Sequence, residues 1–369
     1  MKRVLAIGGR GRIGAKIARD LRERCQQLGL EVEIEATGRS SLDLSDTDAL
    51  SCAIAKVDLV IHTAGPFASR DDRVLRACIA NRAHYLDVSD SRHFTEAMLV
   101  HRDAAREAGI VAIVNTGVFP GLSNSLVKAC VEHLQSLVES ETGDKLSELD
   151  EIDEIALSYA VGGSGGAGIT VMRTTFLALQ RPFSAMLGGQ WQTVAPYSDR
   201  EVVDFPGFGA IGTYWFDVPE TLTLARHFKA RTVTTKFGSA PDFYNLLTAA
   251  VARFCPAPLL QNPAAIEFLS RVSYAMTQVT DRWSGVGVAM RARAVAGDRA
   301  VESTLCHSDT ARAAGIGGGS VAAAILAEDI ATPGLWTVEE IVPTALFDRV
   351  AREDGFTWTP PHEKLNDER

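Results

Sequence analysis

Short apolar runs alternate with longer amphipathic stretches over residues 1 to about 118. Residues 4–7 are apolar at every position, which is typical of a parallel strand buried on both faces. In residues 13–28, Ile13, Ile17, Leu21 and Cys25 recur at every fourth position, which predicts a helix with one buried face. The same alternation predicts further strands at 32–37, 42–44, 58–63, 85–88 and 110–115, and helices at 45–55, 70–81 and 94–108. Elements in this order indicate an α/β fold with a doubly wound parallel sheet.

The pattern changes after Pro120 and Gly121, where we expect a second domain to begin. A helix is predicted at 122–137, a solvated acidic loop at 139–154, a strand at 155–161 and a glycine-rich loop at 162–168. Short apolar pieces from 191 to 237 suit a mostly antiparallel sheet, and 286–296 with 300–307 predict a hairpin. Helices are predicted at 319–329 and 338–354. Because 369 residues are too many for one ordinary core, we expect two domains, the second of the α+β class.

The composition and charge of the chain limit the kinds of molecule that it is expected to bind. Hydrophobic residues make up 46% of the chain and charged residues 22%, which is typical of a folded, water-soluble protein. The formal net charge of −9 argues against a nucleic-acid partner, because phosphate binding needs a positive surface. The six cysteines form no Cys-x-x-Cys pair, so neither a metal site nor a disulfide scaffold is expected. The N-terminus opens into a strand rather than a secretion signal, and no window reaches the roughly 18 apolar residues of a membrane span, so we expect a cytoplasmic protein.

The most informative motif is Gly9-x-Gly11-x-x-Gly14, which follows the first predicted strand and opens the first helix. In a dinucleotide-binding Rossmann domain, the first glycine permits a tight turn, the second lets a pyrophosphate approach the backbone, and the third lets helix and strand pack closely. The free amides and positive dipole end of the helix then bind the phosphates. A glycine-rich turn without a ligand is the alternative. The predicted phosphate-binding residues are Gly8, Gly9, Gly11, Arg12, Ile13 and Gly14.

The tip of the second strand indicates which dinucleotide would bind. NAD-preferring sites place an acidic residue there to bind the ribose hydroxyls. In this chain Gly38 stands where the acid would be, and Arg39 and Ser40 follow as donors suited to a 2′-phosphate. Glu35 falls inside the strand rather than at its tip. The sequence therefore favours NADP(H) over NAD(H), with an ordinary solvated turn as the alternative role for Arg39.

Two further loops are candidates for contact with the cofactor. Ala64, Gly65 and Pro66 follow the predicted strand at 58–63, at the carboxyl edge where open parallel sheets bind their ligands. A tight strand–helix connection is the alternative for this loop. Asp43 is a candidate for the adenine region, and a hydrogen bond to nearby backbone is its alternative.

Several segments together resemble the saccharopine dehydrogenase-like family of oxidoreductases, namely residues 8–14, 38–40, 60–67, 84–90, 117–124 and 332–336 with Glu339 and Glu340. The resemblance implies an NAD(P)-binding Rossmann domain at 1–120 plus about 308–369, because the last helices of the family return to the first domain. Residues 121–307 would then be the substrate domain, and the exposed edges of its sheet lead us to expect that it is also the dimerisation domain. The resemblance also implies hydride transfer at a carbon–nitrogen bond, whereas the identity of the substrate does not carry over.

Hydride transfer also needs a group that manages a proton. Tyr85 and Asp87 alternate on one predicted strand, so both point the same way near the carboxyl edge of the sheet, and they match the family's Tyr-x-Asp segment. They are the candidate catalytic residues. The alternative is that Tyr85 packs on the sheet and Asp87 caps the next turn. Asn115, Phe119 and Pro120, at the end of the sixth predicted strand, are predicted to line the substrate pocket beside the nicotinamide.

The sequence thus predicts an NADP-dependent oxidoreductase that acts on an imine or secondary amine. Reduction of an activated carbon–carbon double bond is a second hypothesis, and a non-catalytic NADP-binding sensor is a third. Edge-strand logic leads us to expect a homodimer formed through the open sheet of the second domain.

Overall fold

The computed structural model describes residues 1–38, 40–142, 152–162, 169–179, 181–260, 262–284 and 287–365. Arg39 and most of the predicted loops at 139–154 and 162–168 lie outside the described residues. The chain forms two compact units. Unit 1 comprises Met1–Leu122 and Ala311–Val350, and unit 2 comprises Ser123–Thr310 and Ala351–Arg369.

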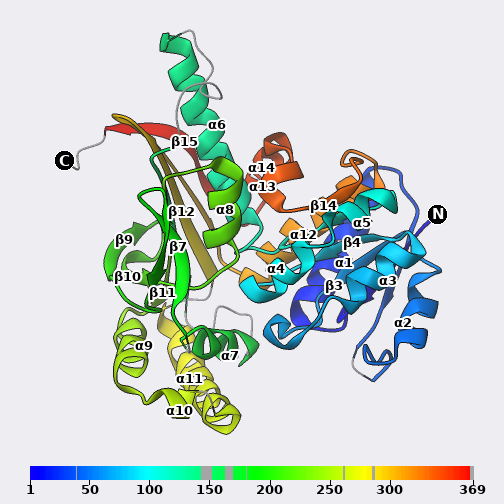
Figure 1. Ribbon diagram of the computed structural model, residues 1–369, viewed down its shortest axis with the longest axis horizontal. Helices are drawn as coiled ribbons and strands as arrows, with labels where there is room; N and C mark the ends of the chain where they lie inside the picture. Colours follow the sequence, from blue (N-terminus) through cyan, green and yellow to red (C-terminus); the bar gives the residue numbers. More distant parts are fainter. Residues whose placement is uncertain are drawn as a thin grey trace. The chain divides into compact units, whose positions relative to one another are not determined.

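Unit 1 is built on a six-stranded sheet in the order β14-β5-β4-β3-β1-β2 (Figure 1). The strands are β1 (Lys2–Ile7), β2 (Val32–Ala36), β3 (Leu59–His62), β4 (His84–Asp87), β5 (Val111–Ile113) and β14 (Gly334–Trp336). Every neighbouring pair is parallel. Because β1 has β2 on one side and β3 on the other, the strand order reverses at β1. In such sheets ligands bind at this reversal, beyond the carboxyl ends of the strands.

Helices cover both faces of this sheet. They are α1 (Arg12–Gln27), α2 (Thr47–Ile54), α3 (Arg73–Asn81), α4 (Arg92–Leu99), α5 (Arg102–Glu107), α12 (Thr310–Leu326), α13 (Val338–Ile341) and α14 (Thr344–Ala351), with the short 3₁₀ turn η1 (Phe67–Ser69). Successive residues of β3 point to opposite faces: Ile61 packs in a core with side chains of α1, α12 and α14, and Val60 in a core with side chains of α2, α3 and α4. The predicted doubly wound parallel sheet is therefore confirmed.

The sequence prediction was wrong at three places in unit 1. Residues 42–44 form no strand, because Leu42 and Leu44 pack against the α2–α3 core from a turn that Asp43 stabilises. The predicted helix at 94–108 is broken into α4 and α5. Strand β14 was missed, since its three residues begin with a glycine and are too short to show a pattern.

Unit 2 contains a seven-stranded mixed sheet in the order β15-β13-β12-β6-β11-β10-β9 and a hairpin of β7 with β8. The strands are β6 (Glu154–Gly162), β7 (Phe183–Leu187), β8 (Gln190–Val194), β9 (Glu201–Phe205), β10 (Gly209–Trp215), β11 (Thr232–Ala240), β12 (Gly287–Ala296), β13 (Arg299–His307) and β15 (Phe356–Leu365). The pairs are antiparallel except for β6 with β11, which is parallel. The helices are α6 (Leu122–Thr142), α7 (Ile169–Ala178), α8 (Glu220–Phe228), α9 (Phe243–Phe254), α10 (Ala257–Leu260) and α11 (Pro263–Ser284). The predicted α+β second domain is confirmed.

The end of the chain differs from the sequence prediction. The predicted helix at 338–354 is divided into α13 and α14, and the chain then forms β15, which pairs with β13. The return of the whole segment 308–369 to the first domain is therefore wrong for its last residues, which extend the sheet of unit 2. Pro360 and Pro361 hid this strand from the sequence analysis, and an edge position is where prolines are tolerated. Among the described helices, none is long and apolar enough to cross a membrane.

Candidate nucleotide-binding site

The glycine-rich loop begins where β1 ends. The Gly9 N–H donates to the carbonyl oxygen of Ala6 (N···O 3.0 Å), and the Gly11 N–H donates to that of Gly8 (2.8 Å). Gly8 has a φ of 78°, in the left-handed region that glycine adopts without strain. The chain therefore makes two tight turns before it enters α1.

Packing requires glycine at positions 9 and 14 as well as at position 8. A Cβ atom on Gly9 would lie 2.8 Å from the Cβ of Ala6, and one on Gly14 would lie 2.5 Å from Oγ1 of Thr63. For a Cβ on Gly11 the nearest atom would be the Gly8 carbonyl oxygen, at 3.1 Å. Gly14 thus sets the distance between α1 and the end of β3, whereas Gly11 leaves its backbone open to close approach, as a pyrophosphate requires.

Helix α1 starts with an open N-terminus. Its N-cap residue, Gly11, supplies no side-chain cap, and its first turn, which is fully described, contains no acidic residue. Arg12 is exposed there and Ile13 is half-buried. The first amides of a helix have no acceptor within the helix, and the dipole makes this end positive. A glycine cradle joined to such a helix end fits the pyrophosphate of a dinucleotide.

Arg10 lies against the tip of β2. Its Nε donates to the carbonyl oxygen of Ala36 (3.2 Å), and its Cδ would lie 3.6 Å from a Cβ placed on Gly38. Gly38 opens a turn in which its N–H donates to Oγ of Ser41 (2.8 Å). Ser40 is exposed in this turn. A guanidinium group and hydroxyl groups therefore gather where an NAD-preferring site would hold a carboxylate.

The loop after β3 contacts the glycine-rich loop. A Cβ on Gly8 would lie 2.8 Å from the backbone nitrogen of Ala64. Arg70 fixes this second loop, since its Nε donates to the Ala64 carbonyl oxygen (2.9 Å) and its Nη2 to that of Gly65 (3.5 Å). The Gly65–Pro66 peptide is cis, and a Cβ on Gly65 would make only ordinary contacts, the closest at 3.7 Å. Packing alone thus does not explain the glycine at position 65.

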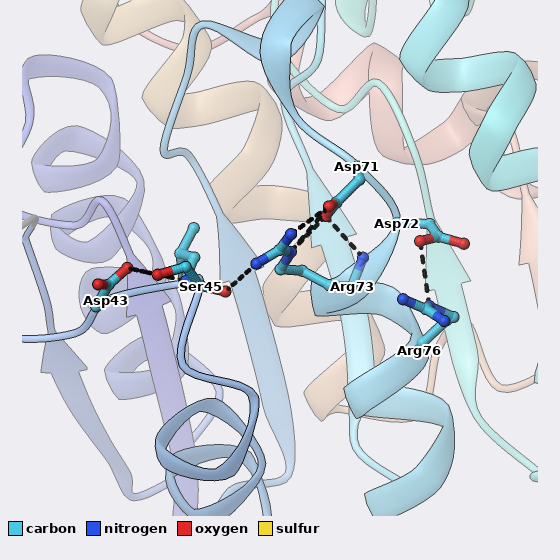
Figure 2. Close-up of polar contacts among 7 residues, drawn as sticks. Asp43, Ser45, Asp71, Asp72, Arg73 and Arg76 are labelled. Carbon is cyan, nitrogen blue, oxygen red and sulfur yellow. Dashed lines mark hydrogen bonds and ion pairs between the residues drawn. The ribbon is translucent and has the colours of Figure 1, made fainter.

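Figure 2 shows Asp43 turned toward its own loop. Ser45 donates to Oδ1 of Asp43 from its N–H (2.9 Å) and from its hydroxyl (2.8 Å), and these bonds hold the pKa of Asp43 below its usual value. Arg73, at the start of α3, donates from Nη1 to the Leu44 carbonyl oxygen (3.0 Å) and binds the carboxylate of Asp71 (2.6 Å from Nη2 to Oδ2). Asp43 therefore makes the local hydrogen bonds that were its alternative role, and its contact with adenine stays a prediction.

Tyr85 and Asp87 belong to a buried chain of hydrogen bonds across the ends of β3, β4 and β5. The Tyr85 hydroxyl donates to Oδ2 of Asp87 (3.0 Å) and lies 3.3 Å from Nδ1 of His62. Oδ1 of Asp87 accepts from the N–H groups of Ser89 (2.9 Å) and Asn115 (3.0 Å). These contacts match the alternative weighed for the pair, in which Tyr85 packs on the sheet and Asp87 orders the turn that follows.

Burial sets the protonation of this network. It raises the pKa of Asp87 to about 6, although the three hydrogen bonds that the carboxylate accepts act in the opposite direction. Burial also raises the pKa of Tyr85 well above its usual value and lowers that of His62 to about 3, so His62 is neutral at physiological pH. Its Nε2 has no hydrogen-bond partner among the described residues and lies among aromatic rings. The position of the proton on His62 follows from the bond that Nδ1 makes with Tyr85.

The segment after β5 was predicted to line the substrate pocket. Asn115 has a φ of 65° and is buried, and its Nδ2 donates to the carbonyl oxygen of Ser89 (2.8 Å). The Phe119–Pro120 peptide is cis; Phe119 is half-buried and Pro120 is buried. Asn115 is thus tied to the same turn as Asp87, while the contact of Phe119 and Pro120 with a substrate stays a prediction.

The parallel sheet of unit 1 brings the predicted site residues together at its carboxyl edge. The glycine-rich loop follows β1, the Gly38–Ser41 turn follows β2, the Ala64 loop follows β3, and the Asp87 network spans the ends of β4 and β5. Arg70 was not predicted as a site residue, because the sequence does not distinguish an arginine that binds loop carbonyl groups from a solvated one. The place of Arg10 beside the second strand could have been inferred from the Rossmann topology.

Comparison with known proteins identifies relatives of this site. Residues 4–113 match the family described as the saccharopine dehydrogenase NADP binding domain. A carboxynorspermidine synthase from Vibrio alginolyticus is 23% identical over 233 residues, which cover 59% of this chain and 53% of the synthase. A saccharopine dehydrogenase-like oxidoreductase from Homo sapiens is 27% identical over 113 residues, which cover 30% of this chain and 26% of that protein. The chain thus matches about half, or less, of the length of these curated relatives.

The fold also has a solved counterpart. Saccharopine dehydrogenase (L-Glu forming) from Saccharomyces cerevisiae, in its apo form, matches 99% of this chain and 100% of its own with a TM-score of 0.65 and 14% sequence identity. At this identity the likeness establishes the fold and not the activity. Together with the family match, it confirms the resemblance that the sequence motifs indicated.

Proposed function

We propose, from the premise that residues 4–113 are a saccharopine dehydrogenase NADP-binding domain, that this chain is an NADP-dependent oxidoreductase. The hydride would pass to or from the carbon of an imine or secondary amine in a small molecule. The observation that carries the proposal is the glycine cradle. Gly9 and Gly14 are fixed by packing, Gly11 leaves the backbone open, and the α1 N-terminus carries no acid.

Arg10 supports NADP over NAD. The 2′-phosphate of NADP would lie at the tip of β2, where Arg10 and the Gly38–Ser41 turn offer donors. Glu35, the nearest acid in β2, is exposed within the strand and not at its tip. A carboxylate at the tip would repel the 2′-phosphate, and a guanidinium attracts it. Arg39 and Ser40 stay predicted contacts.

When bound, the nicotinamide supplies or accepts the hydride. The chain's own residues bind and orient it: the glycine loop holds the pyrophosphate, and Arg70 fixes the loop that contains Ala64, Gly65 and Pro66. Asp87 is a positioning residue, because it fixes the backbone N–H groups of Ser89 and Asn115 at the two strand ends. The Tyr85 hydroxyl donates a hydrogen bond to Asp87 and lies beside His62. Because Tyr85 is fully buried, its role would be to orient Asp87 and not to transfer a proton directly to a substrate.

An activity screen tests the proposed reaction. We expect NADPH to be consumed with mixtures of a primary amine and an aldehyde or keto acid, which form imines in solution. Turnover of enones without any turnover of imines would instead support reduction of a carbon–carbon double bond. Tight NADPH binding with no turnover at all, unchanged by Tyr85→Phe with Asp87→Asn, would support the sensor and contradict the proposal.

The cofactor preference is tested by Arg10→Ala. A charged hydrogen bond to a phosphate contributes about 1.5–3 kcal/mol, so NADPH should bind roughly tenfold to a hundredfold more weakly. Binding of NADH should not change, since it lacks the 2′-phosphate. Arg19→Ala is the matched control, because it removes the same charge from an exposed position on α1 where Arg19 pairs with Glu23. Equal losses for NADPH and NADH would assign Arg10 to the loop structure and not to the 2′-phosphate.

A further inference from the structure

Three consecutive helices of unit 2 expose large apolar side chains. Helices α9, α10 and α11 follow one another along the chain and lie together at one end of unit 2, drawn from lime to yellow in Figure 1. Phe254 is 76% exposed, Phe268 66% and Val279 65%. The exposed members of this apolar face are Phe243, Leu246, Leu247, Phe254, Leu259, Phe268, Val272, Met276 and Val279.

The buried side of α11 carries Ile266 but is otherwise partly polar, and its exposed side is largely apolar. A surface helix normally buries its apolar stripe and exposes its polar side. In α11 the buried positions include Ser270 and Thr277, whose hydroxyls donate to carbonyl oxygens of the same helix (2.7 and 2.9 Å). Phe268, Val272, Met276 and Val279 recur at intervals of four, four and three residues on the exposed side. This spacing forms a continuous stripe of the kind that packs against another helix.

Helix α9 repeats the pattern and is firmly attached to the sheet. Its buried face carries Asn245, which accepts from the Ser239 N–H (2.7 Å) and the Tyr197 hydroxyl (2.9 Å) and donates to Oδ1 of Asp242 (3.0 Å). Phe243, Leu246, Leu247 and Phe254 lie on the exposed side, three, four and eleven positions along from the first. The exposure is therefore a property of an anchored helix and not of a detached one.

We propose that the α9–α11 apolar face is the surface through which two copies of this chain associate. The nine side chains are 37–76% exposed, and their summed exposed area is on the order of the 800 Å² that each partner contributes to a standard interface. Phenylalanine, methionine and arginine are enriched in the cores of such interfaces, and lysine is depleted. This face contains three phenylalanines and a methionine, and no lysine occurs between Lys236 and Lys364.

The charges on α9–α11 favour a second copy of the chain over a membrane as the partner of this apolar face. Residues 243–284, from the start of α9 to the end of α11, contain five charged residues, Arg253, Glu267, Arg271, Asp281 and Arg282. Glu267 binds both Arg173 (2.7 Å) and Arg271 (2.7 Å). An interfacial membrane helix carries basic residues along its polar face, and anionic lipid would repel a chain with a net charge of −9. In a twofold contact between two such faces, Glu267 can keep its pairs with Arg173 and Arg271, and the guanidinium of Arg253 can stay against the ring of Phe254.

The proposed contact between copies lies on helices α9–α11. The sequence had instead led us to expect it at the open edges of the sheet of unit 2. Edge strand β9 exposes Glu201 and Asp204, and edge strand β15 contains Pro360 and Pro361, devices that discourage strand pairing. The inference concerns unit 2 alone and does not depend on the proposed nucleotide chemistry of unit 1.

Sedimentation velocity of the whole chain tests the proposal. We expect a dimer at micromolar concentration, and Phe268→Glu or Val279→Glu should raise its dissociation constant at least about a hundredfold, since a buried unpaired carboxylate opposes association. Val202→Glu is the matched control: Val202 is 54% exposed on β9, outside the face, and its change should leave the dimer intact. Far-UV circular dichroism and NADPH binding, which report on folding and on unit 1, should be the same in all variants.

A monomeric wild-type chain would overturn the proposal, as would a dimer that survives both substitutions on the α9–α11 apolar face or is lost in Val202→Glu. Co-sedimentation with phosphatidylcholine and phosphatidylglycerol vesicles, abolished by Phe268→Glu, would assign the face to a lipid surface and would also overturn it.

Discussion

Asp87 is a buried carboxyl whose protonation is tied to the stability of unit 1. Its pKa in the folded chain is about 6, above the 3.8 of an exposed aspartate, because burial disfavours the charged form. The folded state therefore binds a proton more tightly than the unfolded state does between these two values. A raised carboxyl pKa means that stability falls as pH rises through this window, by about 3 kcal/mol for a shift of about two pH units.

Asp87→Asn should remove this pH dependence. The amide oxygen still accepts the N–H bonds of Ser89 and Asn115, and its NH₂ group donates to the Tyr85 hydroxyl oxygen, which then donates to His62. Urea unfolding across pH 4 to 8 should show the variant gaining stability relative to the wild type as pH rises through about 6. Asp43→Asn is the control, because the pKa of Asp43 is lowered from 3.8, so the stability it contributes changes only below about pH 4 and its difference curve should stay flat through pH 6. Parallel curves for wild type and Asp87→Asn would show that Asp87 is not the titrating group.

Residue-level roles were the hardest to predict from sequence. Alternation along β4 correctly placed Tyr85 and Asp87 on one side of the strand. Their full burial was not readable, because the side chains that cover them, such as Phe67 and Phe94, come from other elements. The same limit applies to Arg70, whose partners are backbone carbonyls that a residue pattern does not reveal.

At the scale of elements, the turn from β1 into α1 contains a glycine that packing requires, Gly14, and a glycine whose expected role is to let a ligand approach the backbone, Gly11. Gly14→Ala should destabilise unit 1 by about 1–3 kcal/mol, because the added methyl would overlap Oγ1 of Thr63 and also the Gly8 carbonyl oxygen and Gly9 Cα, which cannot move away without moving the backbone. Gly11→Ala should cost less, about 1 kcal/mol, since its φ of −76° suits alanine and the added Cβ would be close to a single atom, the Gly8 carbonyl oxygen at 3.1 Å, which need give way only slightly.

Binding should separate the same two variants in another way. Gly11→Ala should stay folded at room temperature and bind NADPH at least about tenfold more weakly, since its methyl occupies the path of the pyrophosphate. Thermal unfolding and fluorescence titration measure the two effects. A Gly11→Ala variant that binds NADPH as tightly as the wild type would mean that the phosphates do not pass over this loop.

Elements with a strong apolar period were predicted well, and those without one were not. Strand β1 and helix α1 followed directly from their apolar spacing. The false strand at 42–44 had two leucines around an aspartate, and the aspartate formed a turn with Ser45 instead of a ladder. Strand β15 was missed because its prolines argue against pairing, although an edge strand accommodates them.

At the scale of the whole molecule, the change of pattern after Pro120 and Gly121 did signal a second unit, and the structure passes from unit 1 to unit 2 at Leu122 and Ser123. The family resemblance led us to expect that α12, α13 and α14 would lie in unit 1. It did not lead us to expect that the chain would then form β15 and pair with β13 in the sheet of unit 2. The apolar face of α9–α11 was not foreseen either, because periodicity marks an apolar stripe without telling whether the fold buries it.

The most direct test of the account is isothermal titration calorimetry of the 369-residue chain with NADPH and with NADH. We expect saturable binding of a single NADPH per chain, at least about tenfold tighter than binding of NADH. Gly11→Ala should weaken both, and Arg10→Ala should weaken NADPH alone. The absence of binding heat with either nucleotide at several temperatures would contradict the claim that the loop after β1 holds a dinucleotide.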